Sequence, residues 1–170
     1  VAFPAVAAPT VPPLLAGKKI AIARDAAYGF IYPANLDTLR ALGAELAFFS
    51  PLGGETLAAD SAALWLPGGY PELHGVALAA NARLWTDVRA HVVAGRPLLA
   101  ECGGMMSLLD AVVDTAGVEH AFAGVLPGRA LMQKRLAALG MQQLDLPQGS
   151  VSGHTFHYSK SETPLTPLTR

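Results

Sequence analysis

Apolar and polar residues follow two repeating patterns along the chain, and each pattern predicts a different element. Short apolar runs are typical of buried strands, whereas apolar residues three and four positions apart are typical of amphipathic helices. Short apolar runs predict strands at residues 18–23, 45–49, 63–66 and 98–100. Helical spacing predicts helices at residues 35–42, 78–93 and 105–109. After Asp114 the pattern weakens, and we expect mixed strand and short helix at residues 121–126, 129–138 and 150–158.

Strands that alternate with helices through short connections predict a parallel α/β sheet with right-handed crossovers. The fold class we expect is an open, mostly parallel sheet with helices on both faces, in a flavodoxin-like three-layer arrangement. In such sheets the ligand crevice lies at the carboxyl ends of the strands. Cys102 and the turn Pro67-Gly68-Gly69 follow predicted strands, so both fall at that edge.

The composition is that of a globular domain. The chain has 170 residues, of which 52% are hydrophobic and 15% are charged, which is enough apolar material for a core. A formal net charge of −1 gives no electrostatic reason to expect nucleic acid as a partner. No apolar run reaches the roughly 18 residues that a membrane helix needs, so we expect no membrane partner. A single cysteine excludes an internal disulfide framework and favours the cytoplasm.

The first residues of the chain are rich in proline, with Pro4, Pro9, Pro12 and Pro13. Proline fixes φ and removes a backbone donor, so this segment is expected to be extended rather than helical. We therefore expect an interdomain linker remnant at residues 1–16 and one domain at residues 17–170. A chain that begins inside a linker is expected to have been separated from an upstream segment.

The only cysteine, Cys102, stands between an apolar run and two glycines. A strand, a tight glycine turn and a helix together make a nucleophile elbow, which holds a side chain on a strained corner above a parallel sheet. The N-terminal end of the following helix favours the thiolate over the thiol. We interpret Cys102 as a nucleophile. The alternative is a buried structural cysteine, which is the commoner role of a lone cysteine.

A thioester mechanism also needs two backbone N–H donors aimed at the oxyanion. Gly69 and Gly103, the residue after Cys102, are the expected pair, because glycine frees the backbone at both turns. A plain tight turn is the alternative interpretation of Gly68-Gly69.

A thiol nucleophile needs a base, and the chain has five histidines: His74, His91, His120, His154 and His157. His154 and His157 are three apart, so on a strand they point to opposite faces and at most one can face Cys102 unless the segment bends. No cysteine or carboxylate stands at zinc-ligand spacing, so we expect no metal site. The chain contains neither GxxxxGK[ST] nor GxGxxG, so we expect it to bind no cofactor through those loops.

Three motifs carry a resemblance to a known family: LPGGYPEL (66–73), AECGGMM (100–106) and GHTFHYS (153–159). Together with residues 24–52, they resemble the C-terminal glutamine amidotransferase domain of cobyrinate or hydrogenobyrinate a,c-diamide synthases. The resemblance covers residues 18–166 and implies a triad-type class I glutamine amidotransferase fold. Cys102 matches the family's nucleophile.

The resemblance also implies the partners of this domain. These are glutamine, an N-terminal synthetase domain that uses ATP and Mg, and a corrin precursor bound there, whose a and c acetate side chains are amidated. Within the matching motifs we expect substrate binding by Gly68, Tyr70, Gly104 and His154. Cobyric acid synthases are a neighbouring branch, but Met106, Tyr158 and Ser159 favour the a,c-diamide branch.

The chain departs from the family at its C-terminus. The base histidine of the superfamily usually stands on a later strand, in a segment of the SYLHLHF type that this chain lacks before Arg170. We therefore expect the domain to be truncated and slow as a catalyst. His157 is the candidate for the base, or for support beside the pocket. Two alternatives remain: another cysteine-elbow hydrolase such as a peptidase, and a non-catalytic docking module.

Overall fold

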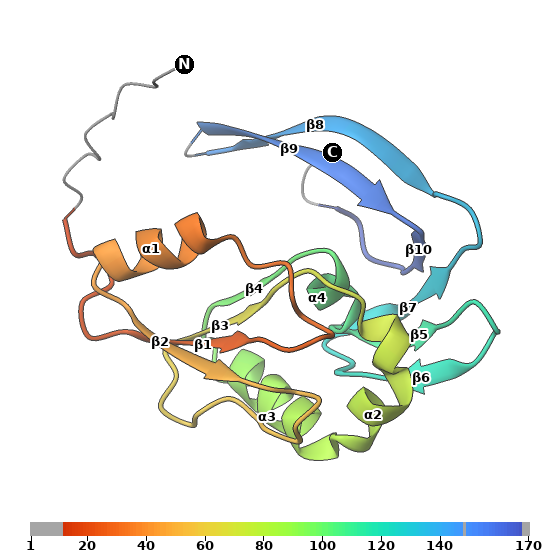
Figure 1. The fold of residues 1–170 in the computed structure, drawn as a ribbon, viewed down its shortest axis with the longest axis horizontal. Coiled ribbons are helices and arrows are strands. Elements are labelled where there is room, and N and C mark those ends of the chain that lie inside the picture. The colour runs from red at the N-terminus through yellow and green to blue at the C-terminus, as the bar shows by residue number, and fades with distance from the viewer. Residues whose placement is uncertain (1–11, 148, 168–170) are drawn as a thin grey trace.

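A parallel sheet of four strands forms the centre of the computed structural model, which describes residues 12–147 and 149–167 (Figure 1). The strand order is β2-β1-β3-β4. The strands are β1 (Lys19–Ala23), β2 (Glu45–Phe49), β3 (Ala63–Leu66) and β4 (Leu98–Ala100), and all neighbouring pairs run parallel. The four strands predicted from the apolar runs are thus confirmed.

Helices cover both faces of this sheet, as predicted. Figure 1 shows α1 (Pro33–Ala41) on one side of the sheet, and α2 (Gly75–Ala80) and α3 (Ala82–Val93) on the other. Alternation along β1 assigns its residues to the two layers. Ile20 and Ile22 form a cluster with residues of α1, whereas Ala21 and Ala23 join the main core with α3. The α3 residues in that core are Leu84, Trp85 and Val88.

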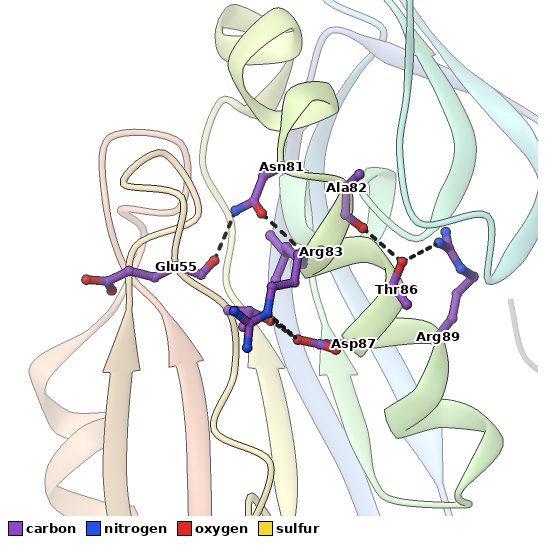
Figure 2. A network of polar contacts seen from close by, with 9 residues as sticks. Glu55, Asn81, Ala82, Arg83, Thr86, Asp87 and Arg89 are labelled. Carbon is purple, nitrogen blue, oxygen red and sulfur yellow. Dashed lines mark hydrogen bonds and ion pairs between the residues drawn. The ribbon is translucent and has the colours of Figure 1, made fainter.

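The helical pattern over residues 78–93 contains a break that the sequence did not predict. Asn81 has φ −81° and ψ 62°, which separates α2 from α3. Its side chain accepts a hydrogen bond from the Leu84 N–H and donates to the carbonyl oxygens of Pro51 and Glu55. Figure 2 shows Asn81 reaching from the start of α3 to the connection between β2 and β3. The helix restarts at Asn81 because this amide caps α3 and holds that connection at the same time.

The second half of the chain forms a mixed sheet, also of four strands, in the order β10-β7-β5-β6. Its strands are β5 (Leu109–Val113), β6 (Glu119–Ala121), β7 (Leu126–Met132) and β10 (Ser159–Glu162). The predicted helix at residues 105–109 is wrong beyond its first two residues. The helix α4 (Gly103–Met106) is a single turn, and Leu109 already begins β5. Burial of Leu109 and Val112 in this sheet outweighs the helix propensity of the segment.

A two-stranded antiparallel ribbon joins β7 to β10. It consists of β8 (Ala138–Leu146) and β9 (Gly149–His157), and most of its residues are exposed. In Figure 1 the ribbon extends beyond the layered part of the chain, on the side of α1. Several large apolar side chains are exposed on it: Leu139, Met141, Leu144, Leu146, Val151 and Phe156.

Two segments bear on the predicted boundaries. Residues 1–11 of the predicted linker lie outside the described residues. Residues 12–16 lead into a turn that contacts the domain, where the Leu15 N–H donates to the Leu42 carbonyl and Leu15 packs beside α1. The helices that the structure describes are all too short or too polar to span a bilayer.

The turns at the carboxyl ends of β3 and β4 pack backbone against backbone. A Cβ atom on Gly104 would overlap the carbonyl oxygen of Leu66, and one on Gly103 would overlap Pro71 and the Gly69 carbonyl. A Cβ atom on Gly69 would overlap the carbonyl of Ala27, in the connection after β1. Glycine is therefore required at these positions because no side chain has room, and three connections meet at one point of the sheet edge.

Replacing Asn81 with Ala should lower the free energy of unfolding by about 2 kcal/mol, because a helix cap and two hydrogen bonds are lost. Thr86→Ala, on the exposed face of the same helix, should change it by less than about 0.5 kcal/mol. Urea denaturation of both variants measures the difference. Equal effects would contradict the cap.

Gly104→Ala should lower the free energy of unfolding by about 3 kcal/mol, because the new methyl group has to displace the backbone of Leu66. Gly153→Ala is the matched control, since a Cβ atom there meets open space, and it should stay within about 0.5 kcal/mol of the parent. Thermal and urea unfolding of the two variants test the packing. A fully tolerated Gly104→Ala would show that the turns are not in contact.

Candidate active site

Cys102 occupies the sharp corner between β4 and α4. Its φ of 50° and ψ of −119° make it the only non-glycine residue with positive φ in the described ranges. An L-residue rarely adopts this conformation, which costs roughly 1–3 kcal/mol and persists only where the surroundings impose it. The thiol is free and exposed. The corner therefore holds a sulfur atom at the carboxyl edge of the parallel sheet, open to solvent.

Two buried hydroxyl groups, those of Tyr28 and Ser107, are hydrogen-bonded in series to the carbonyl oxygen of Gly103, the residue after Cys102. The Ser107 hydroxyl donates to the Gly103 carbonyl at 3.1 Å and lies 2.8 Å from the Tyr28 hydroxyl. Because the single Ser107 proton goes to Gly103, the Tyr28 hydroxyl is the donor to Ser107. Both side chains are fully buried, and burial raises the pKa of Tyr28 well above its usual value. Tyr28 thus stays protonated and links the connection after β1 to the elbow.

The predicted glycines come together around Cys102. A Cβ atom on Gly68 would stand 3.2 Å from the Cys102 Cβ, and Gly69 packs against Gly103. Within the described residues, neither the Gly69 N–H nor the Gly103 N–H donates to a protein acceptor. Tyr70, the next residue along, is 46% exposed and lies edge-on to the Phe30 ring. The structure thus gathers five of the predicted site residues, Gly68, Gly69, Tyr70, Gly103 and Gly104, at one place beside Cys102.

The two candidate histidines stand on β9 of the ribbon. His154 pairs with Met141 and His157 with Ala138, which puts them on opposite faces of β9. The His157 Nδ1 lies 2.9 Å from the Ser159 carbonyl oxygen, whereas His154 is exposed. No hydrogen bond in the described part of the chain connects either histidine to Cys102. Their roles as base and as substrate-binding residue therefore stay predictions.

Two carboxylates flank the site, and the sequence had singled out neither. Glu101, directly before the thiol, accepts a hydrogen bond from the Trp65 indole at 3.1 Å. Glu72 follows Pro71 in a short 3-10 helix (Pro71–His74), and burial raises the pKa of its carboxyl group. Across residues 12–147 and 149–167, no three histidine, cysteine, aspartate or glutamate side chains are placed to hold a metal ion.

Phe30, Tyr28 and Ser107 are contacts of the elbow that the motifs alone did not indicate. Phe30 and Tyr28 belong to the segment 24–52, which resembles the family over its whole length without a short motif at either residue. Their proximity to Cys102 depends on the adjacency of β1 and β3, which a single sequence does not reveal.

Comparison with known proteins identifies the family of the chain. Residues 19–170 match the family described as the CobB/CobQ-like glutamine amidotransferase domain. The chain is 56% identical over 168 residues to a hydrogenobyrinate a,c-diamide synthase of Stutzerimonas stutzeri, covering 96% of this chain and 39% of that protein. It is 51% identical to a cobyrinate a,c-diamide synthase of Herminiimonas arsenicoxydans, covering 95% and 37% respectively. The chain thus spans about two fifths of the length of these relatives.

Solved structures show the same fold at low sequence identity. A glutamine amidotransferase matches with a TM-score of 0.54 and 22% identity, over 81% of this chain and 70% of that one. A putative peptidase E protein from Listeria monocytogenes matches with a TM-score of 0.51 and 14% identity, over 66% of this chain and 64% of that one. The class I amidotransferase-like fold is therefore shared with a protein of another named activity. Sequence and fold together show that the chain belongs to the CobB/CobQ-like glutamine amidotransferase domain family.

Proposed function

We propose that this domain hydrolyses glutamine at Cys102 and supplies the ammonia for amidation of a corrin precursor. The observation that carries the proposal is the strained, exposed Cys102 beside two glycine amides that lack protein acceptors. Strain at a single exposed nucleophile is typical of sites where the backbone presents a side chain for reaction. Membership of the amidotransferase family supports glutamine as the substrate.

The reaction begins when a base takes the Cys102 proton and the sulfur attacks the side-chain amide carbon of glutamine. The carbonyl oxygen becomes an oxyanion, which the N–H groups of Gly69 and Gly103 stabilise. The tetrahedral intermediate collapses to a thioester as the protonated base gives its proton to the leaving nitrogen, which departs as ammonia. Water then cleaves the thioester, which yields glutamate and restores the thiol.

His157 is our candidate for the base or for support beside the pocket. A carbonyl oxygen only accepts hydrogen bonds, so the contact with Ser159 places a proton on the His157 Nδ1. In the neutral imidazole, a proton on Nδ1 leaves Nε2 free to accept the thiol proton. Gly68, Tyr70, Gly104 and His154 complete the residues that we assign to substrate binding.

The activity of the longer relatives suggests where the ammonia goes. The two diamide synthases are named for hydrogenobyrinate and cobyrinate, and this chain spans 39% and 37% of their lengths. We assign ATP and Mg, and the amidation of the a and c acetate side chains, to a synthetase domain in the remainder of such proteins. The present chain contains no phosphate-binding loop of the GxxxxGK[ST] type, and we assign no ATP-dependent step to it. The cytoplasm keeps the thiol reduced and remains the expected compartment.

Two other functions predict different results. A cysteine-elbow peptidase would process peptides or esters without preferring glutamine, and the likeness to peptidase E supports only the fold. A docking module would need no thiol. The 56% identity to a diamide synthase favours the amidotransferase over both.

Diazo-oxo-norleucine, a glutamine analogue, should alkylate Cys102 of the 170-residue chain, and mass spectrometry should locate the adduct. Excess glutamine should slow the alkylation, whereas an equal excess of an amino acid that lacks the side-chain carboxamide should not. Because Cys102 is the only cysteine, Cys102→Ser removes the sole thiol, and the adduct should vanish. Labelling that glutamine does not slow would contradict glutamine binding.

In a full synthase that carries this domain, Cys102→Ser should lower glutamine-dependent amidation by at least about a thousandfold, because the nucleophile is lost. Amidation from added ammonium salt should persist, since it bypasses the thioester. Both rates are measured by product formation from the corrin substrate. Unchanged glutamine-dependent amidation would instead establish the docking module.

A further inference from the structure

Phe30 lies beside the nucleophile, although it is 72 positions away from it in the chain. The Phe30 N–H donates to the Gly68 carbonyl at 3.0 Å, and the two residues form an isolated antiparallel bridge. A Cβ atom on Gly68 would stand 3.2 Å from both the Cys102 Cβ and the Phe30 Cδ2. The ring edge and the Cys102 Cβ therefore lie within twice that distance of each other, with only a glycine between them.

The connection that carries Phe30 is firmly held. The Asp25 carboxylate accepts hydrogen bonds from the Ala27 N–H, the Leu52 N–H and the Ser50 hydroxyl. Tyr28, two residues before Phe30, is buried, and its hydroxyl group is hydrogen-bonded to that of Ser107. These contacts hold the backbone of the residues that lead up to Phe30.

The Phe30 side chain lies outside the hydrophobic core. It is 46% exposed, and so is Tyr70, whose ring meets it edge-on with centroids 5.1 Å apart and an interplanar angle of 83°. Such edge-to-face pairs keep both rings in a defined orientation. An ordered pair of half-exposed aromatic rings beside an exposed thiol presents an apolar surface to whatever reacts there.

The chemistry of the proposed substrate matches this surface. Glutamine has two methylene groups between its carboxamide and its α carbon, and these must extend away from the sulfur when the carboxamide carbon reaches it. Apolar pocket walls commonly contact such segments, while a few polar groups orient the reacting atoms. The glycine turns supply the polar groups, and the two aromatic rings supply the apolar wall.

We propose that Phe30, braced by Tyr70, is a substrate-positioning residue whose ring contacts the methylene groups of the linear amide substrate and guides its carboxamide to Cys102. This inference rests on the proposed function and deepens it. Phe30 makes the site selective for an unbranched aliphatic chain of sufficient length, since a shorter side chain contacts less of the ring.

The test uses alkyl methanethiosulfonates, which transfer an alkylthio group to a thiolate, form a mixed disulfide and release methanesulfinate. The rate constants of the butyl and methyl reagents with the 170-residue chain are measured by mass spectrometry. The butyl-to-methyl ratio, divided by the same ratio for free cysteine, is the chain-length preference. We expect it to be about fivefold in the parent, the order expected for partly burying the extra methylene groups. Phe30→Ala should reduce it to about one, and Phe30→Leu should restore part of it.

Tyr32→Ala is the matched control, because Tyr32 is a more exposed aromatic residue, 65% exposed, in the same connection. It should keep the full chain-length preference. An unchanged preference in Phe30→Ala would overturn the proposal, and so would an equal loss in Tyr32→Ala, which would point to general loosening of the connection. Circular dichroism of each variant confirms that it is folded before its rates are compared.

Protection of Cys102 by glutamine separates this proposal from the function on which it rests. Protection together with a chain-length preference that Phe30→Ala does not alter would overturn the role of Phe30 and leave glutamine hydrolysis in place. A preference that depends on Phe30 without protection by glutamine would overturn glutamine as the substrate. It would indicate that the Phe30 ring contacts the aliphatic chain of a substrate other than glutamine.

Discussion

The direct contact between two glycine turns positions everything else at the candidate site. Gly103 lies so close to the Gly69 carbonyl that it cannot carry a side chain, and Gly104 lies against the last residue of β3. This contact is possible because β3 and β4 are parallel neighbours, so that both turns leave the sheet at the same edge. The amides of two separate connections thereby come to lie beside one thiol.

The strain at Cys102 follows from the same constraint. With α4 packed against the turn after β3, the chain enters the helix through a sharp turn at Cys102. The buried Ser107 and Tyr28 hydroxyls then hold the first peptide of the helix in place. Backbone packing, not an interaction of the sulfur, therefore fixes where the thiol stands.

The central layer could be predicted from the sequence because its strands are short apolar runs bounded by glycine or proline. The elbow could be predicted because Cys102 stands between such a run and two glycines. The break at Asn81 could not be foreseen, since both flanking segments favour helix and the carbonyl oxygens that hold the amide lie about 30 residues upstream. The sequence pattern also fails at Leu109, because a short apolar segment suits either a helix or a strand until its partner strand is known.

Phe30 shows the same limit at the site. Nothing in its local sequence points to Cys102, and its place beside the thiol comes from the pairing of β1 with β3. The fold alone does not define the chemistry either, since an amidotransferase and a peptidase E share this architecture. The chemistry depends on a few positions where connections from several strands converge.

The positive φ of Cys102 has a consequence for how this protein can change. The conformational cost belongs to the position and would burden almost any residue placed there, while glycine alone would escape it. A chain that no longer needed the thiol could therefore become more stable through Cys102→Gly. The thiol therefore stands at a position whose backbone conformation favours glycine.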